Sequence, residues 1–163
     1  MIPCLTNNRG ARRGSAFVEW AISSLVVVPL LFAALQAGHA FYIYNLLSSQ
    51  VRDGVRYASR RTFRCADTAS IAKFKTAVSN MARFGSPDGT GALLEPGLTA
   101  DQIEVQIKDK NGDDAGPANV PAYVIVSTAN YSVDGVLKKI DFGGKPVLQF
   151  PYVGQYAPAE SER

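Results

Sequence analysis

The sequence predicts an α+β fold with a long N-terminal helix whose first half spans a membrane, a second short helix and a small antiparallel sheet of about three strands. Three observations lead to this class. An apolar run from Ala16 to Ala37 continues at helical spacing into a water-facing stretch, and an amphipathic segment with helix-end signals follows. The C-terminal third has the side-chain patterns of strands. The 163 residues suffice for an anchor and one small domain.

Residues 1–14 form a basic head that carries Arg9, Arg12 and Arg13 and no acidic residue. Without this head the Lys and Arg count falls from 17 to 14, which equals the 14 acidic residues. The positive net charge therefore belongs to the head, as is typical of a targeting segment. We expect residues 1–14 to be a leader, and we expect no nucleic-acid partner.

The apolar run predicts a transmembrane helix over residues 15–38. A spanning helix needs about 20 mostly apolar residues, and Ala16 to Ala37 supplies 22. Pro29 removes one helical hydrogen bond and should kink the helix near Leu25. A buried core helix is the alternative, but the basic flank and the length favour the membrane.

The helix is expected to continue to about Thr62 as a water-facing segment, with Gly38 and Gly54 as its weak points. Its apolar side chains recur on one face at helical spacing, namely Tyr44, Leu47, Val51, Val55 and Ala58. A second face carries Arg52, Arg56 and Arg60. This arginine stripe is either a solvated face or a contact for acidic neighbours or anionic lipid headgroups.

The rest of the chain predicts one helix and three strands. Asp67-Thr68 offers a cap and Gly85 a stop, so a helix should run over about 68–84, followed by a Gly- and Pro-rich loop. The expected strands are a half-buried one around 103–107, a central one over 123–133 and an edge strand with Pro151 over 147–156. Helix should cover one face of this sheet.

The most informative short motif is the junction Gly14-Ser15, which is followed by Glu19 and Trp20 at the entry to the apolar run. A carboxylate at the centre of a membrane helix costs about 2.5–3.5 kcal/mol on insertion scales, so an acid near the helix entry needs a reason. A cut after Gly14 would give Ser15 a free α-amino group. That cation could pair with Glu19 of its own chain or of a neighbour.

Gly14-Ser15 with a glutamate fifth in the mature chain resembles the processing site of type IV pilin-like proteins. The sequence that follows, at residues 29–31, 38, 41–45 and 51–58, resembles TadE-like minor pseudopilins of the tight-adherence (Flp) pilus. The resemblance covers about residues 12–60. It implies a structural subunit for pilus assembly, with processing at Gly14 and Ser15 and an assembly or recognition role for Glu19 and Trp20.

The resemblance also implies partners and a location. The expected partners are a prepilin peptidase, other pilin and pseudopilin subunits, the inner-membrane assembly platform and the lipid bilayer. The chain would cross the bacterial inner membrane once, and entry into the pilus stays open. Residues 39–163 would form a pilin-like domain outside the cytoplasm.

Charge supports this orientation, although the two flanks of the helix compete. Three arginines precede the apolar run, and five follow it at 52, 56, 60, 61 and 64. Arg52 lies 17 residues past Leu35, at the edge of the range in which flanking charge sets topology, and long domains translocate largely regardless of charge. We therefore place the C-terminal domain outside.

No residue pattern predicts an enzyme, a cofactor or a metal site. His39 is the only histidine, and loss of Cys4 with the leader would leave Cys65 alone, either buried or paired between chains. Asp109 and Asn111 begin a run with the first spacings of a calcium loop. The glycine and glutamate that such a loop requires are Asp114 and Val120, so a hairpin turn is favoured.

An alternative function is a secreted or periplasmic binding domain behind an ordinary signal peptide. Gly38-His39-Ala40 offers small residues for a signal peptidase. Glu19 argues against this alternative because it interrupts the entry to the apolar core. The mature N-terminus separates the two, because the pilin hypothesis predicts Ser15 and the secreted one predicts Phe41.

Overall fold

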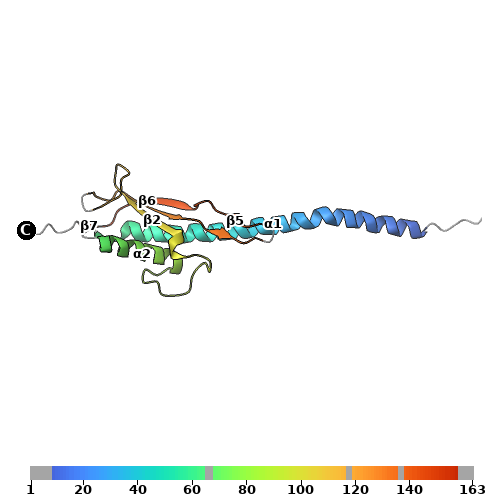
Figure 1. Ribbon diagram of the computed structural model, residues 1–163, viewed down its shortest axis with the longest axis horizontal. Coiled ribbons are helices and arrows are strands. Elements are labelled where there is room, and N and C mark those ends of the chain that lie inside the picture. The colour runs from blue at the N-terminus through green and yellow to red at the C-terminus, as the bar shows by residue number, and fades with distance from the viewer. Residues whose placement is uncertain (1–8, 65–67, 117–118, 136–137, 158–163) are drawn as a thin grey trace, which may run out of the picture.

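The computed structural model describes residues 9–64, 68–116, 119–135 and 138–157, so Cys4 and Cys65 lie outside the described residues. Its dominant element is the helix α1, Arg9–Arg60, which runs along the length of the molecule (Figure 1). The second half of α1 lies in a small α+β domain, and the first half projects from it. The predicted fold class is confirmed.

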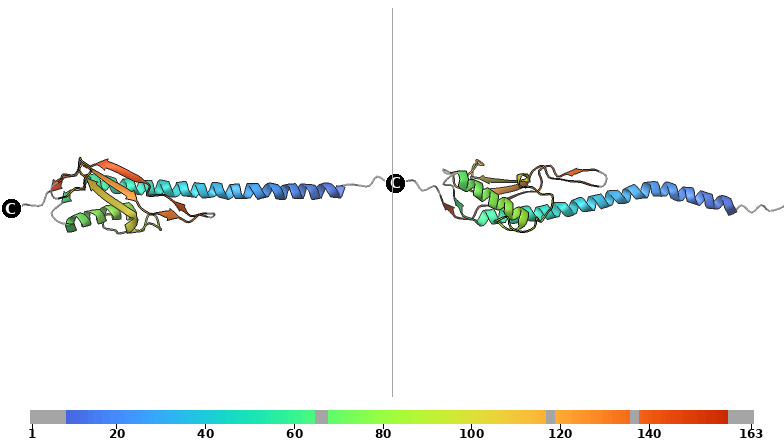
Figure 2. Two further views of the ribbon diagram at one scale, coloured as in Figure 1. Left: turned by 45° about the horizontal axis from the view of Figure 1, so that its top comes forward. Right: turned by 60° about the horizontal axis from the view of Figure 1, so that its bottom comes forward.

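Helix α1 is continuous from the basic head to the domain. It begins at Arg9, within the expected leader, and ends at Arg60, two residues before the predicted end. It passes through Gly38 and Gly54 without a break, and it bends in its first half around the stretch that contains Pro29 (Figure 2). The bend follows from the hydrogen bond that proline cannot donate.

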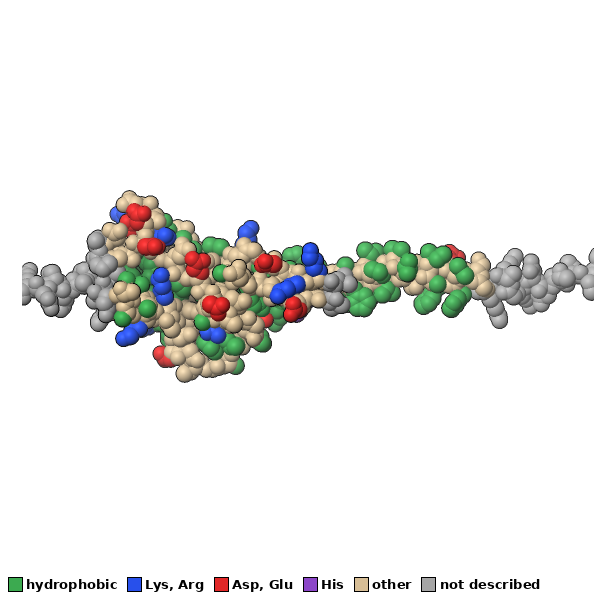
Figure 3. All heavy atoms as spheres, viewed as in Figure 1, with side chains coloured by type: hydrophobic (Ala, Val, Ile, Leu, Met, Phe, Trp, Pro, Cys, Tyr) green, Lys and Arg blue, Asp and Glu red, His purple; other side chains and the backbone are tan. Residues whose placement is uncertain are grey.

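The two halves of α1 have opposite surroundings. In the second half, the apolar face predicted from helical spacing is the centre of the core, with Leu47, Val51, Val55 and Ala58 fully buried. In the first half, large apolar side chains such as Leu25 and Leu30 stay exposed, 76% and 63% respectively. Figure 3 shows this half as a rod covered by apolar side chains. The apolar run is therefore not a core helix of this chain.

Helix α2, Thr68–Phe84, has the range that the sequence predicts. It buries Phe74, Val78, Ser79 and Ala82 and packs against α1. Gly85 follows at φ +69°, a left-handed conformation that glycine adopts without strain and that commonly ends a helix. The amphipathic pattern and the stop at Gly85 thus predicted this element, while Asp67 of the expected cap lies outside the described residues.

The sheet has three antiparallel strands in the order β2-β3-β6. They are β2 (Ile103–Lys108), β3 (Tyr123–Thr128) and β6 (Val147–Pro151), preceded by a short 3-10 turn at Ala100–Gln102. In β2 and β3 the buried side chains face one another across the ladder, as in the pair Val105 and Val126. Helix α1 packs against β3 and β6, and α2 packs against β2, so helices cover this buried face (Figure 2).

The predicted central strand is too long at its C-terminal end. It was expected to reach Val133, but β3 ends at Thr128, because Asn130 adopts φ 52° and breaks the extended conformation. The chain then forms a separate hairpin from β4 (Ser132–Val133) and β5 (Ile140–Asp141). β3 is still the central strand, as predicted.

The predicted edge strand is confirmed at its start and shortened at its end. β6 stops at Pro151, and the chain turns before β7 (Tyr156–Ala157) pairs in parallel with β1 (Phe63–Arg64). The Tyr152 hydroxyl donates to the Arg61 carbonyl at 2.8 Å, which ties this turn to the end of α1.

Candidate functional site

The residues that the sequence predicts as a processing and assembly site lie together on the exposed half of α1. Ser15 and Glu19 are one helical turn apart, so their side chains share a face. With Gly14, they line a shallow depression of about 430 Å³ along the helix, together with Val18, Ile22 and Ser23. Gly14, Ser15 and Glu19 are all exposed. Glu19 is the only acidic residue between Gly14 and Ala40.

Trp20 lies next to this face rather than on it. Its side chain is 67% exposed and contacts the ring of Phe17, with 6.4 Å between the centroids. Both aromatic side chains therefore cover the helix surface beside Glu19. The structure brings Gly14, Ser15 and Glu19 onto one face, with Trp20 beside it.

The described residues of the rest of the chain do not cover the site. Gly14 has no heavy atom within 4 Å of the position where a Cβ would lie, apart from its own helix neighbourhood. Of the described part of the chain, one helix is long and apolar enough to cross a membrane, and its apolar window has a mean hydropathy of 2.1 with none of it buried. The apolar half of α1 thus has the length, composition and exposure of a membrane anchor.

The arginine stripe lies far from that anchor. Arg52 comes 17 residues after Leu35, about 26 Å further along the axis at 1.5 Å per residue. A headgroup layer is only about 5–8 Å thick on each side of the hydrocarbon core. For a helix that crosses the bilayer, these arginines lie beyond the lipid, which leaves a solvated face or an acidic protein neighbour.

One depression at the end of α1 combines this stripe with aromatic and acidic side chains. It measures about 520 Å³ and is lined by Asp53, Arg56, Tyr57, Arg60, Arg61 and Met81. The Arg61 guanidinium stacks over the Tyr57 ring, 5.3 Å from its centroid, and donates a hydrogen bond to the Tyr57 hydroxyl.

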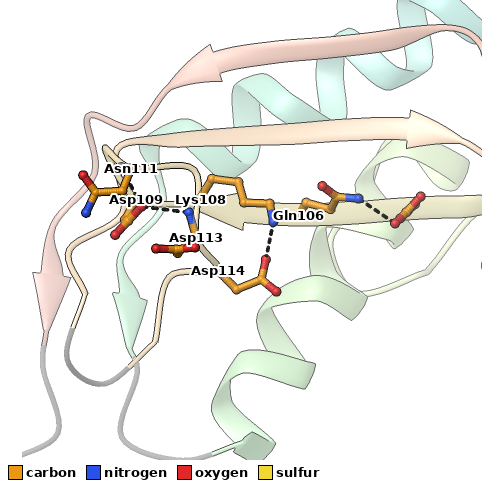
Figure 4. A network of polar contacts seen from close by, with 7 residues as sticks. Gln106, Lys108, Asp109, Asn111, Asp113 and Asp114 are labelled. Carbon is orange, nitrogen blue, oxygen red and sulfur yellow. Dashed lines mark hydrogen bonds and ion pairs between the residues drawn. The ribbon is translucent and has the colours of Figure 1, made fainter.

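The segment with calcium-loop spacing is a turn whose own backbone amides hydrogen-bond to its first carboxylate (Figure 4). Asp109 is buried, and its Oδ1 accepts hydrogen bonds from the amides of Asn111 at 2.8 Å and Asp113 at 3.0 Å. The Lys108 ammonium pairs with Asp114 at 2.8 Å, and this hydrogen bond raises the pKa of Lys108. Gly112 takes φ +89° at the tip. The favoured hairpin turn is confirmed.

Metal chemistry has no candidate site in the described ranges. No group of three or more His, Cys, Asp or Glu side chains gathers there in a way that could hold an ion. His39 is exposed on α1.

Sequence reasoning missed one contact that positions the anchor. The Gln36 Nε2 donates to the Lys138 carbonyl at 2.9 Å, so the β4–β5 hairpin reaches α1 where its apolar run ends. The only sequence signal for this hairpin is Asp134-Gly135, a common turn dipeptide between two short strand-like runs.

Comparison with protein families matches part of α1. No curated protein and no solved structure matches the chain. The family model described as TadE-like protein matches residues 14–56, which begin at the junction glycine and run through the exposed half of α1 into its buried half. Over residues 14–56 the chain is therefore similar to the TadE-like proteins, which are associated with the tight-adherence pilus, as the sequence resemblance predicted.

Proposed function

We propose that the chain is a membrane-anchored minor pseudopilin, a structural subunit for assembly of tight-adherence pili. The observation that carries this proposal is the uncovered apolar half of α1, on which Gly14, Ser15 and Glu19 share one face inside the segment that matches the family. An apolar helix with no partner in its own chain needs either lipid or other apolar helices. A pilin-like subunit lies in lipid before assembly and packs against other apolar helices after it.

In this proposal a prepilin peptidase of the bacterial inner membrane cuts after Gly14. Ser15 then carries a free α-amino group, which pairs with a Glu19 carboxylate and sets the register between packed helices. The domain of residues 39–163 lies outside the cytoplasm and contacts other pilin and pseudopilin subunits and the assembly platform. The role is structural and not enzymatic.

The contact between Gln36 and the hairpin supports a mature chain that keeps the apolar half of α1 over one that loses it as an ordinary signal peptide. A signal peptidase cut after Ala40 would remove Gln36 and with it the hydrogen bond to Lys138. It would also remove Ala37 and Ala40, two of the side chains that line a pocket with Phe142. The folded domain therefore includes residues that the secreted alternative would discard.

The test is the mature N-terminus of protein purified from membranes of cells that express the pilus machinery. We expect N-terminal sequencing to find Ser15, and Gly14→Leu to block the cut, because a bulky side chain replaces the small one at the junction. A Cβ at residue 14 meets nothing in the described part of the chain, so this variant should fold and insert normally.

Gly38→Leu is the matched control, since residue 38 is equally open on the same helix. It should be processed like the wild type. An N-terminus at Phe41 would support the secreted alternative, and a Ser15 N-terminus in the Gly14→Leu variant would overturn processing at this junction.

A further inference from the structure

The end of the domain nearest the apolar half of α1 is formed by the β4–β5 hairpin, which runs alongside the helix (Figure 1). Basic and acidic side chains gather at this end, next to the apolar rod (Figure 3). The described charged residues of the hairpin are Asp134, Lys138, Lys139 and Asp141, and all four are exposed. A charged hairpin beside the exit of a membrane helix raises the question of what it contacts.

The height of this hairpin follows from its contact with Gln36. The apolar stretch from Ala16 to Leu35 has 20 residues, which corresponds to about 30 Å of helix and matches the hydrocarbon thickness of a bilayer. Gln36 therefore lies at the boundary with the headgroups. Its side chain donates to the Lys138 carbonyl at 2.9 Å, which puts the lysine backbone at the same level.

Close packing holds the hairpin in this place. A Cβ on Gly135 would lie 2.5 Å from the Gln36 amide nitrogen and 2.5 Å from the Lys138 carbonyl oxygen, so only glycine fits there. Further along α1, Phe142 contacts Tyr44 at 5.9 Å and stacks on Tyr131 at 6.1 Å between centroids. Burial and a hydrogen bond to Glu95 raise the pKa of Tyr131 to about 12.

The surface around the hairpin has the composition of a membrane interface. Phe41 and Tyr42 are 69% and 64% exposed just past the apolar run, where interfacial aromatic side chains are enriched in membrane proteins. A pocket of about 390 Å³ beside them is lined only by apolar and aromatic side chains, namely Ala37, Ala40, Phe41, Tyr44 and Phe142. Phe41 lies five residues, or about 8 Å, past Gln36, so these aromatic side chains lie at the level of the headgroups.

We propose that the β4–β5 hairpin is a lipid-contact element: Lys138 and Lys139, held at the level of Gln36, bind the phosphates of anionic phospholipids in the outer leaflet. This rests on the membrane anchoring in the proposed function, and not on processing or pilus assembly. The two acids of the hairpin balance its charge, so the contact is local and depends on the positions of the two ammonium groups.

The test uses the full chain with Cys4 and Cys65 replaced, reconstituted in vesicles of phosphatidylcholine and phosphatidylglycerol at 3:1. A fluorophore on Asp134→Cys reports headgroup contact through quenching by phospholipids with a spin label on the headgroup. We expect strong quenching, and stronger quenching by labelled phosphatidylglycerol than by labelled phosphatidylcholine. A fluorophore on Lys110→Cys, in the exposed turn between β2 and β3, should be quenched by neither.

The lysines are tested by Lys138→Gln with Lys139→Gln in the Asp134→Cys background. The preference for phosphatidylglycerol should fall by roughly thirtyfold, given the usual contribution of two lysines beside an anionic surface. Lys110→Gln in the same background should leave the preference unchanged. Equal quenching by both lipids in the parent protein, or a preference that survives loss of both lysines, would overturn the proposal.

Trp20, the only tryptophan, separates failure of the hairpin from failure of the anchor. Its fluorescence should be quenched by lipids brominated on the acyl chains when α1 is inserted. Quenched Trp20 with an unquenched label at residue 134 would overturn the lipid contact alone. Unquenched Trp20 would overturn the anchoring itself, and with it both proposals.

Discussion

Glu19 shows how much one side chain changes the interpretation of an apolar helix. It is exposed on α1 one turn after Ser15, and the described residues around it offer no cationic partner from the rest of the domain. In lipid, an unpaired carboxylate is costly unless a cation comes from another source. The α-amino group of a processed Ser15 is such a source.

Glu19→Gln tests this pairing, because the amide keeps the shape and removes the charge. We expect normal processing and insertion, since loss of a charge eases insertion, together with loss of assembly. Removal of one partner from a buried ion pair costs about 3–5 kcal/mol, because the other charge is left alone. The measurement is recovery of other pilus subunits by pull-down and a count of surface filaments.

Asp53→Asn is the control for Glu19→Gln, because it removes an exposed acid from the same helix but within the domain. It should assemble like the wild type. Wild-type pull-down and filament counts from a correctly processed Glu19→Gln protein would show that the carboxylate has no part in assembly.

At the scale of elements, the sequence pattern predicted those helices and strands whose bounds depend on neighbouring residues. The range of α2 and the half-buried strand β2 follow from periodicity and from the stop at Gly85. The hairpin contact with Gln36 was not predictable in this way, because its two partners are 102 residues apart and leave no periodic signal. The central strand was predicted too long for another reason, since β-branched and aromatic side chains continue past the point where Asn130 turns the chain.

Gly54 illustrates a packing constraint that sequence alone presents as a weak point. It is buried between the helices, and a Cβ there would lie 3.1 Å from the Cβ of Ala82 and 3.5 Å from the carbonyl oxygen of Val78. Glycine therefore lets α1 and α2 approach closely. The helix gives up some intrinsic stability at this position in exchange for closer packing of the core.

We expect Gly54→Leu to destabilise the domain by about 1–3 kcal/mol, because the added atoms have no space between the helices. Gly38→Leu is the matched control on the same helix. Its site is open, so it should be neutral or gain up to about 1 kcal/mol from helix propensity. Denaturant unfolding in detergent, followed by circular dichroism, measures both, and equal stability of the two variants would contradict the role of Gly54.

The whole molecule has its exposed apolar surface at one end and its folded domain at the other. The apolar half of α1 projects from one end, while β1 and β7 lie at the other end of the domain (Figure 1). The basic head lies before the apolar run, and the exposed loop around Asp88 belongs to the domain. The apolar window of α1 is not buried by the described residues, so a single bilayer crossing there would separate the head from the domain.

Topology is tested by accessibility of a single thiol in a variant with Cys4 and Cys65 replaced. Arginines 9, 12 and 13 favour a cytoplasmic head, so the loop around Asp88 should face outwards. A membrane-impermeant maleimide should label Asp88→Cys in intact spheroplasts. As the control, Asn7→Cys in the uncut Gly14→Leu form should react only after lysis. The opposite pattern, with residue 88 protected until lysis, would place the domain in the cytoplasm and remove it from any contact with an external pilus.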